Sequence, residues 1–457
     1  MPCSGKNQIY IVNIEGLNAE GHGIGSIDGF KMFIPGALPG ETVRILTVKL
    51  KKTFGYGKLL EVIEPSDMRV EPLCEVFGKC GGCGLQHMSY AAQLEYKTKK
   101  VADALRKIGG ADCAVLSTIG VKDPYRYRNK AQFPVRAACD GGVDIGFFAA
   151  RSHRIVPIND CALQSPVNKR ILSTIKNFML KNKIKPFIEP FDQERHMGLI
   201  RHVITRVGYK TGEIMVCIVI NGENLPHSAE LVRELLQIKN MTSIVLNINM
   251  RRTNVIMGER VETLYGQGFI TDNVGAVKLR ISPKSFFQVN TPQTEVLYKT
   301  AAEFARLSLN DTVIDAYCGI GSISLFIADR VKKVWGIEIT PEAIADARVN
   351  AELNGVENVE FLCGSTENEL AGLAARVSPD VIFLDPPRKG CDRRVLSAAA
   401  QSGAERIIYI SCDPATLARD VKIIAAMGYV AQKAQPVDMF AMTPHVETVV
   451  AMQRVGT

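Results

Sequence analysis

TVIDAYCGIGSISL (residues 312–325) runs from an apolar segment of strand character through a glycine turn into a helical pattern. The turn contains Gly319 and Gly321, and Glu338 ends the next apolar segment. In a doubly wound sheet such glycines let a nucleoside approach the backbone, and the acid accepts hydrogen bonds from its ribose. The dinucleotide fingerprint needs a third glycine where Ser324 stands, so S-adenosylmethionine, which has no pyrophosphate, fits better. A tight turn without a ligand is the alternative interpretation.

The sequence around this turn predicts a doubly wound α/β domain. Apolar runs alternate with helical stretches, which is typical of a parallel sheet covered by helices. One helix is expected to begin at Thr340 and Pro341 and to end near Gly355. The last strands follow one another closely, which suggests an antiparallel edge. The expected strands are residues 312–317, 334–339, 359–362, 381–384, 407–410, 429–437 and 446–452.

Two further regions precede this domain. Residues 1–63 alternate short β-rich runs with glycine turns and predict a small antiparallel β-barrel. Residues 64–285 mix strand and helix patterns and predict an α+β central domain, so the Rossmann-like domain occupies residues 286–457. A chain of 457 residues is too long for one ordinary domain, which agrees with this division.

Composition and hydropathy narrow the cellular location and the class of partner. No apolar stretch is long enough to cross a bilayer and the first residues lack the pattern of a secretory leader, so a cytoplasmic protein without membrane contact is expected. In a reducing compartment the 12 cysteines are better interpreted as ligands, nucleophiles or core residues than as disulfides. The net charge of +8 favours a polyanionic partner, and no feature indicates an obligate protein partner.

Basic residues that could contact RNA fall in three places. Residues 49–56 interleave three lysines with Phe54 and Tyr56, which suits phosphate contact with base stacking as well as an ordinary solvated strand. In segments 124–130 and 195–206, RNA contact is slightly favoured over solvation of strand ends. The basic residues of these two segments are Arg126, Arg128, Lys130, Arg195, Arg201 and Arg206.

Two more motifs end strands at the same edge of the predicted sheet. VIFLDPPRKG (381–390) ends its strand at Asp385, and RIIYISCDPATLARD (406–420) ends the next at Cys412, before a helix expected from Pro414. Aligned amides at a helix N-terminus can lower the pKa of a thiol, and the thiolate is the nucleophilic form. Cys412 is therefore a candidate nucleophile, whereas a lone cysteine at a strand end is usually structural.

A thiolate at this place suggests a specific carbon chemistry. Addition of a thiolate to C6 of uracil makes an enolate whose C5 can attack a sulfonium methyl group. A base must then remove the C5 proton. Glu447 in PHVETVVAMQ (444–453) is an isolated acid among apolar residues, and desolvation would raise its pKa towards a useful range. A solvated strand end is the more usual place for such an acid.

These motifs together resemble a known family. SFFQVN, DAYCGIG, IFLDPPRKG, SCDPATLARD and HVETVV, in this order, are similar to the RNA 5-methyluridine methyltransferase family, especially its bacterial 23S ribosomal RNA branch. Residues 1–63 resemble the TRAM domain of that branch. The resemblance implies that Cys412 is the nucleophile and Glu447 the base, and Ser322 stands where the family often has asparagine. The residues that it implies for cofactor contact are Gln288, Tyr317, Glu338 and Asp385.

A second cysteine motif lies in the central region. Cys74, Cys80 and Cys83 have the spacing C-x5-C-x2-C, and the distant Cys161 could supply a fourth thiolate. Four thiolates suit tetrahedral zinc or an iron–sulfur cluster, and the C-x3-C-x2-C loop of radical enzymes does not occur here. The family resemblance implies a [4Fe-4S] cluster with a structural role. The other cysteines, expected to be core or surface residues, are Cys3, Cys113, Cys139, Cys217, Cys318, Cys363 and Cys391.

Three other functions remain in competition. The same chemistry could act on transfer RNA, because the catalytic motifs resemble enzymes for both RNA classes. The DPPR segment could be related to the Asp-Pro-Pro-aromatic loop of amino methyltransferases, but Arg388 is not aromatic and Cys412 and Glu447 would stay unexplained. An RNA-binding ribosome assembly factor with an idle methyltransferase core is the third alternative.

Overall fold

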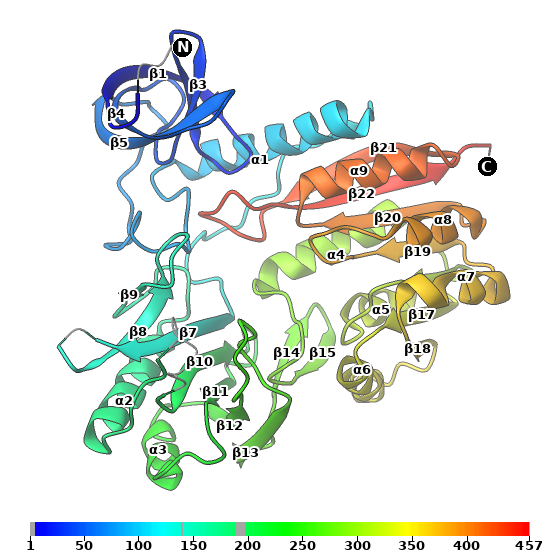
Figure 1. Cartoon of the computed structure of the whole chain (residues 1–457). Helices are drawn as coiled ribbons and strands as arrows, with labels where there is room; N and C mark the ends of the chain where they lie inside the picture. Colours follow the sequence, from blue (N-terminus) through cyan, green and yellow to red (C-terminus); the bar gives the residue numbers. More distant parts are fainter. Residues whose placement is uncertain (1–4, 139, 189–196, 457) are drawn as a thin grey trace.

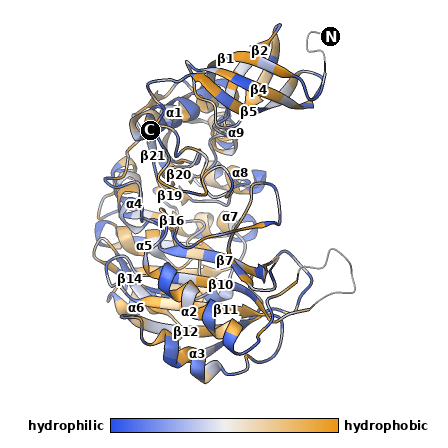
Figure 2. Ribbon diagram, turned by 90° about the vertical axis from the view of Figure 1, so that its left-hand side faces the viewer, coloured by the Kyte–Doolittle hydropathy of each residue, from blue (hydrophilic) through white to orange (hydrophobic). Residues whose placement is uncertain are grey.

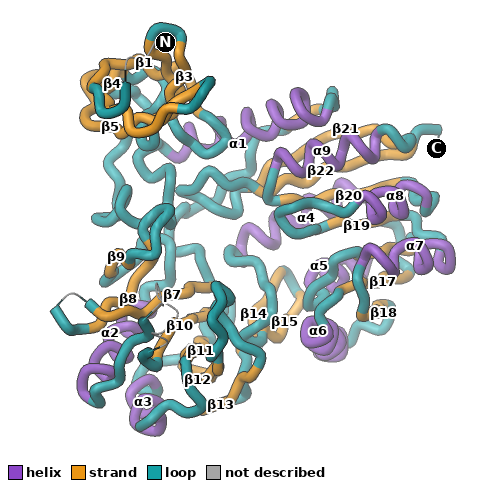
Figure 3. Tube along the Cα trace, in the orientation of Figure 1, coloured by secondary structure: helices purple, strands orange, loops and turns teal. Residues whose placement is uncertain are grey.

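The computed structural model describes residues 5–138, 140–188 and 197–456. A barrel of the N-terminal strands lies at one end, a mixed central sheet lies at the other, and the α/β domain that ends the chain lies alongside (Figure 1). Figure 3 contrasts the all-strand barrel with the α/β domain, where helices flank the strands. Among the described residues, no helix has the length and apolar character needed to span a bilayer.

The barrel is closed by five strands in the order β1-β2-β3-β5-β4, so the predicted barrel is confirmed. The β-rich runs expected from the sequence, residues 9–14, 31–34, 42–49 and 56–63, do not include β2, because its glycines look like turn residues. Gly25 instead lies so close to β1 that a Cβ atom there would meet Val12 at 2.4 Å. β3 and β5 pair in parallel, so the barrel is not wholly antiparallel. The strands are β1 (Ile9–Leu17), β2 (Gly23–Ile27), β3 (Phe30–Ile34), β4 (Thr42–Leu50) and β5 (Phe54–Glu64).

The central domain is built on a seven-stranded sheet in the order β13-β12-β11-β10-β7-β8-β9. Its strand β11 has the sequence IMVCIVI and is buried along its whole length. Two helices, α2 (Val167–Lys181) and α3 (Ser228–Leu235), pack on one face and turn hydrophilic surfaces outward (Figure 2). The strands are β7 (Lys130–Ala137), β8 (Val143–Phe148), β9 (Ile155–Pro157), β10 (Ile200–Val207), β11 (Ile214–Ile220), β12 (Met241–Ile248) and β13 (Arg260–Gly266).

The α/β domain has an eight-stranded sheet in the order β18-β17-β16-β19-β20-β22-β21-β6. The first five strands in this order are parallel, and β22 is antiparallel to both neighbours, so the doubly wound sheet with an antiparallel edge is confirmed. The order reverses between β16 and β19, which opens a crevice at the carboxyl ends of the strands. The strands are β16 (Thr312–Asp315), β17 (Lys333–Glu338), β18 (Val359–Cys363), β19 (Val381–Leu384), β20 (Arg406–Ser411), β21 (Tyr429–Val437), β22 (Glu447–Arg454) and β6 (Ala114–Val115).

Helices cover both faces of this sheet. One apolar core joins it to α4, α5 and α6 and to the hairpin of β14 (Ile270–Val274) and β15 (Val277–Ile281), and a second core joins it to α1, α7, α8 and α9. Helix α1 and strand β6 precede the central sheet in sequence but pack on this domain. The chain therefore contributes these two elements to the α/β domain before it builds the central sheet. The helices are α1 (Tyr90–Ala104), α4 (Thr291–Ala305), α5 (Ser322–Ile327), α6 (Pro341–Leu353), α7 (Thr366–Val377), α8 (Arg393–Gln401) and α9 (Pro414–Ala425).

Candidate active site

The motifs singled out in the sequence meet at one edge of the eight-stranded sheet. Parallel strands β16, β17, β19 and β20 end at this edge, and β22 begins there because it runs in the opposite direction. The residues at these strand ends are Asp315, Glu338, Asp385, Cys412 and Glu447.

The glycine turn after β16 has room beside it. Gly319 has a φ of +54°, and a Cβ atom built there would meet no atom within 4 Å. The backbone N–H of Gly319 donates to Oε2 of Glu338 at 3.3 Å, and the N–H of Thr340 donates to Oε1 at 2.8 Å. These bonds hold the Glu338 carboxylate over the turn, next to open space where a ribose could bind.

Two further acids lie in the crevice. Asp315 is fully buried and accepts a hydrogen bond from the Ser324 hydroxyl at 2.6 Å, but its other oxygen has no partner among the described residues. Burial raises the pKa of Asp315 to about 6, and burial together with the Asp315 charge raises the pKa of Asp385 to about 7. A nearby cation would stabilise both carboxylates. The acids therefore fit S-adenosylmethionine, which carries an ammonium and a sulfonium group.

The other cofactor candidates are held by hydrogen bonds. Gln288 is buried just before α4, and its backbone carbonyl accepts a hydrogen bond from the Asn129 side-chain amide at 2.8 Å. Tyr317 is half-buried beside Cys391, and its pKa is raised by burial first and by that thiol second. The Ser322 hydroxyl lies 2.8 Å from the Tyr298 hydroxyl, so it already has a partner within the protein.

Cys412 is half-buried directly before α9. The predicted lowering of the Cys412 pKa is wrong: burial, assisted by the charges of Glu447 and Asp385, raises the pKa of the thiol to about 11. The amides at the start of α9 are already engaged, because the Asp413 carboxylate accepts hydrogen bonds from the N–H groups of Ala415 and Thr416 at 3.0 and 2.9 Å. They cannot also stabilise a thiolate.

Arg388, rather than the N-terminus of α9, favours the thiolate form of Cys412. Its guanidinium opposes the rise in the pKa of Cys412 through its charge and through a hydrogen bond to the thiol. In the sequence, Arg388 stands out only as a departure from the aromatic residue of amino methyltransferases. The available signal is its place four residues beyond Leu384, the last residue of β19, which puts a cation at the edge that holds the thiol.

Glu447 is buried at the first position of β22. Burial and the Asp385 charge raise its pKa to about 8, which confirms the predicted direction, and Arg388 acts against this rise. Glu447 also influences the pKa of Cys412. The thiol, the two carboxyl groups and the guanidinium therefore form one electrostatically coupled group.

Cys412 also faces a cavity of about 780 Å³ between the barrel and the α/β domain. The barrel contributes Leu17, helix α1 contributes Lys99 and Lys100, and the β21–β22 loop contributes His445. Burial and nearby cations lower the pKa of His445 to about 4, so it is neutral near pH 7. The thiol is thus accessible from a space that is bounded by three parts of the chain.

Comparison with known proteins agrees with this geometry. A family model described as tRNA (Uracil-5-)-methyltransferase matches residues 237–455, and a TRAM domain model matches residues 5–60. An uncharacterized RNA methyltransferase of Halalkalibacterium halodurans is 47% identical over 451 residues, covering 98% of this chain and 97% of the relative. This chain belongs to the RNA uracil-5-methyltransferase family. A second uncharacterized RNA methyltransferase, from Clostridium tetani, is 44% identical over 99% of this chain and 97% of its own length.

A solved structure extends the similarity to the whole fold. The tRNA (uracil-54, C5)-methyltransferase of Pyrococcus abyssi, in complex with S-adenosyl-L-homocysteine, superposes with a TM-score of 0.77 at 28% identity, over 97% of this chain and 99% of that one. As a member of the RNA uracil-5-methyltransferase family, this chain is an S-adenosylmethionine-dependent RNA methyltransferase. An idle assembly factor does not fit this membership.

The four predicted ligand cysteines of this methyltransferase come together around one cavity. Cys74, Cys80, Cys83 and Cys161 line a space of about 380 Å³ in the central domain. Burial raises the pKa of Cys83 to about 12, with smaller contributions from the other three thiols. Within the described ranges, no group of three or more His, Cys, Asp or Glu side chains is arranged closely enough to hold a metal ion.

The donor chemistry at this cavity nevertheless suits a thiolate-bound metal group. The Gln86 amide donates to Sγ of Cys83 at 3.2 Å, and the N–H of Gly82 donates to Sγ of Cys80 at 3.4 Å. Four thiols with such donors match the ligand set of a zinc ion or an iron–sulfur cluster. Outside this cavity, Cys217, Cys318 and Cys391 are buried, Cys113 is half-buried, Cys363 is exposed, and Cys3 and Cys139 lie outside the described residues.

The prediction that Arg201 and Arg206 contact RNA is wrong. Both side chains are buried, and their guanidinium groups donate to backbone carbonyls inside the protein. Arg201 donates to the carbonyl of Asn249 at 2.6 Å, and Arg206 donates to the carbonyl of Ser285, which begins the SFFQVN segment. Arg206 therefore orders the backbone at the start of the SFFQVN segment, Arg201 orders the backbone after β12, and Arg195 lies outside the described residues.

The remaining basic segments lie in two surroundings. Arg126 forms an ion pair with Asp160 at 2.6 Å, and burial lowers the pKa of Lys130 to about 7. On the barrel, Lys51 lies 5.4 Å from the centre of the Phe54 ring, and Arg151 of the central domain lies 6.0 Å from that of Tyr56. Cations from two domains lie over half-buried rings of the barrel, so the barrel surface is the better candidate for RNA contact.

Proposed function

We propose that this enzyme methylates C5 of a uracil in 23S ribosomal RNA through a covalent bond between Cys412 and C6, giving 5-methyluridine. The proposal rests chiefly on one observation: the Cys412 thiol, the Glu447 carboxyl and the Arg388 guanidinium influence one another at the sheet edge that carries the cofactor candidates. Asp385 belongs to the same group.

The first step is addition of Cys412 to the base. The target uridine enters the cavity in front of the thiol after leaving its stack, because C6 and C5 must both be accessible. The thiol proton passes to the Asp385 carboxylate, whose pKa is raised to about 7, so that the Glu447 carboxylate is left to accept the C5 proton later. Sulfur then bonds to C6, the ring electrons move to O4 as an enolate, and Arg388 stabilises the thiolate beforehand.

S-adenosylmethionine supplies the electrophilic methyl group that C5 attacks. Gln288, Tyr317, Gly319, Glu338 and Asp385 are proposed to bind and orient it. Ionised Glu447 then accepts the C5 proton, the C5–C6 double bond re-forms, and Cys412 leaves as a thiolate. Since Glu447 has a pKa of about 8, this last step is expected to accelerate as the pH rises towards 8.

We further propose that Cys74, Cys80, Cys83 and Cys161 hold a [4Fe-4S] cluster. Their common cavity and the N–H donors to sulfur support this assignment. With four protein thiolates the cluster has no open position, so its role is to order the central domain.

Ribosomal RNA is the proposed substrate because the family branch with a TRAM barrel and four such cysteines acts on it. Transfer RNA is a second candidate, since the Pyrococcus abyssi tRNA (uracil-54, C5)-methyltransferase matches 97% of this chain. A cytoplasmic location, and action without an obligate protein partner, are part of the same proposal.

Mass-spectrometric mapping of 5-methyluridine in RNA from cells with and without the gene separates the two substrates. Loss of the modification from at least one position of 23S ribosomal RNA is the expected result. Loss confined to transfer RNA would overturn the ribosomal assignment while leaving the chemistry intact, and unchanged RNA of both classes would overturn both.

A further inference from the structure

The loop that precedes Glu447 is held by helix α1. Residues 438–446 join β21 to β22, and Val437 pairs with Glu447 where the two strands meet this loop. Movement of the loop would therefore move the Glu447 carboxyl group. α1 side chains at positions 90, 93, 97 and 100 share one helix face and bond to residues 438–444.

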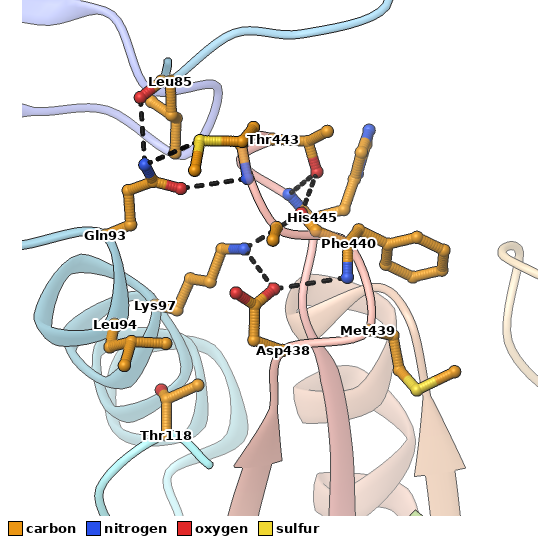
Figure 4. A network of polar contacts seen from close by, with 12 residues as sticks. Leu85, Gln93, Leu94, Lys97, Thr118, Asp438, Met439, Phe440, Thr443 and His445 are labelled. Atoms are coloured by element: carbon orange, nitrogen blue, oxygen red, sulfur yellow. Dashed lines mark hydrogen bonds and ion pairs between the residues drawn. The ribbon is translucent and has the colours of Figure 1, made fainter. Parts of the chain in front are cut away.

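Gln93 and Lys100, which lie before and after Lys97 in α1, make ordinary hydrogen bonds to the loop. The Gln93 amide donates to Sδ of Met442 at 3.3 Å and accepts from the Met442 N–H at 3.0 Å (Figure 4). Lys100 donates from Nζ to the carbonyl of Pro444 at 2.7 Å. The loop is thus attached to α1 at Met442, near the middle of the loop, and at Pro444, close to the end of the loop.

A buried ion pair forms the centre of the contact. Nζ of Lys97 lies 2.6 Å from Oδ1 of Asp438, and both side chains are fully buried. Lys97 also donates to the carbonyl of Phe440 at 3.1 Å, while Asp438 accepts from the Tyr90 hydroxyl at 2.8 Å and from the Phe440 N–H at 3.2 Å (Figure 4). Every bond of the pair is made to the helix or to the loop.

The opposite side of the loop is fixed by other segments. The N–H groups of Gly84 and Leu85, next to the cysteine motif, donate to the carbonyl of Met442 at 3.1 and 3.0 Å. From the start of α4, the Gln293 amide donates to the carbonyl of Asp438 at 3.2 Å. Only the α1 side of this arrangement contains a buried charge pair.

A buried pair of this kind contributes little net stability. Replacing both partners with apolar residues of similar volume is often neutral or stabilising, because the cost of desolvating two charges disappears. What such a replacement removes here is the set of directed bonds that fixes the loop. The pair is therefore better explained by the position that it gives the loop than by a contribution to the free energy of unfolding.

We propose that Lys97 and Asp438 are positioning residues for proton removal by Glu447. This rests on the proposed function above, in which Glu447 accepts the C5 proton. Cys412 follows β20 and has no bond to the loop of residues 438–446 among those the structure gives, so displacement of the loop should affect its addition to C6 less than it affects proton removal by Glu447. Loss of the pair should slow release of the methylated product and spare methyl transfer.

The test is the double variant Lys97→Met/Asp438→Leu, in single-turnover and steady-state reactions with labelled S-adenosylmethionine and substrate RNA. Methyl transfer in the first turnover should stay within about threefold of the wild type. Steady-state kcat should fall by about 10- to 100-fold, since a base displaced by about 1 Å loses a factor of this order. A methylated covalent protein–RNA complex should accumulate, with unchanged KM for S-adenosylmethionine.

The control is a pair at the opposite edge of the same sheet. Arg406 and Asp311 are nearly buried and lie 3.2 Å apart, so Arg406→Met/Asp311→Leu tests whether loss of an ion pair alone has this effect. It should not accumulate the complex. If the Lys97/Asp438 double variant does not fold, Asp438→Asn, which keeps the side-chain shape, should show the same accumulation to a smaller extent.

Glu447→Gln in the same assay separates the two proposals. If Glu447→Gln accumulates the methylated complex and the folded Lys97 or Asp438 variants do not, the positioning role is wrong and the proposed chemistry stands. If Glu447→Gln itself accumulates none, the proposed function fails and the positioning role fails with it. Equal slowing of methyl transfer and product release would also overturn the positioning role.

Discussion

Two groups of thiols in this protein have different surroundings. Cys412 is a single thiol among two carboxyl groups of raised pKa and one guanidinium, in front of a cavity. The four central cysteines line a second cavity together, and the other three thiols add to the burial that raises the pKa of Cys83. A single thiol beside carboxyl groups that can take its proton is suited to reaction, whereas four thiols around one cavity are suited to metal binding.

The comparison also separates two ways in which a site is assembled. Cys412, Asp385 and Glu338 follow strands of one sheet, so the topology of that sheet brings them together. Cys161 reaches the other cysteines from a loop between β9 and α2. A substitution in the first group should therefore change chemistry with little effect on folding, and a substitution in the second should have the reverse effect.

The largest expected effect is that of Cys412→Ala. Methylation should be abolished, because no other group can make C5 nucleophilic, while RNA and cofactor binding should stay within about twofold. Methyl transfer from labelled S-adenosylmethionine and binding assays measure the two properties. Cys113→Ala, a half-buried cysteine distant from the chemistry, is the control and should retain activity. Normal turnover by Cys412→Ala would contradict the mechanism.

The next effect concerns the four-cysteine cavity. Anaerobically purified protein should be brown and contain about four irons per chain. Cys83→Ser should lose the iron and weaken folding or RNA binding before it weakens S-adenosylmethionine binding, because the cofactor candidates lie in another domain. Metal analysis, thermal unfolding and cofactor titration measure these effects. A colourless, active preparation with one zinc ion per chain would refute the cluster.

Much of this architecture could be predicted from the sequence because strand and helix periods are local. The doubly wound sheet, its antiparallel edge and the strand-end positions of Asp385 and Cys412 follow from that pattern. The expected low pKa of Cys412 was wrong because burial, which depends on the tertiary fold, raises it, and because the Asp413 side chain uses the helix amides. Lys97 and Asp438 are far apart in sequence, so no local signal could pair them.

A moderate effect is expected for Arg388→Met. Loss of the cation should raise the pKa of Cys412 further and slow addition to C6 by about 10- to 100-fold, the range for loss of a charged hydrogen bond. Arg388→Lys should recover part of the rate. Adduct formation with RNA containing 5-fluorouridine measures this step directly. An unchanged rate of adduct formation would exclude Arg388 from thiol activation.

The smallest effect is one on stability. Unfolded Glu447 ionises near pH 4.5 and folded Glu447 near pH 8, so the folded protein retains the proton and its stability falls as the pH rises between these values. Glu447→Gln removes this contribution. Its advantage over the wild type should therefore grow by about 2 to 4 kcal/mol from pH 5 to pH 8.5, as measured by chemical unfolding. Parallel pH profiles would show that the pKa of Glu447 is not raised.

The covalent complex of Glu447→Gln tests the central claim most directly. The glutamine keeps the side-chain shape but cannot accept the C5 proton, so turnover should fall by about 10²- to 10⁴-fold and a complex should accumulate towards one per enzyme. Mass spectrometry of the digested complex should find the peptide that contains Cys412 bonded to a uridine that already carries the methyl group. Normal turnover by this variant, or a complex without the methyl group, would contradict the account.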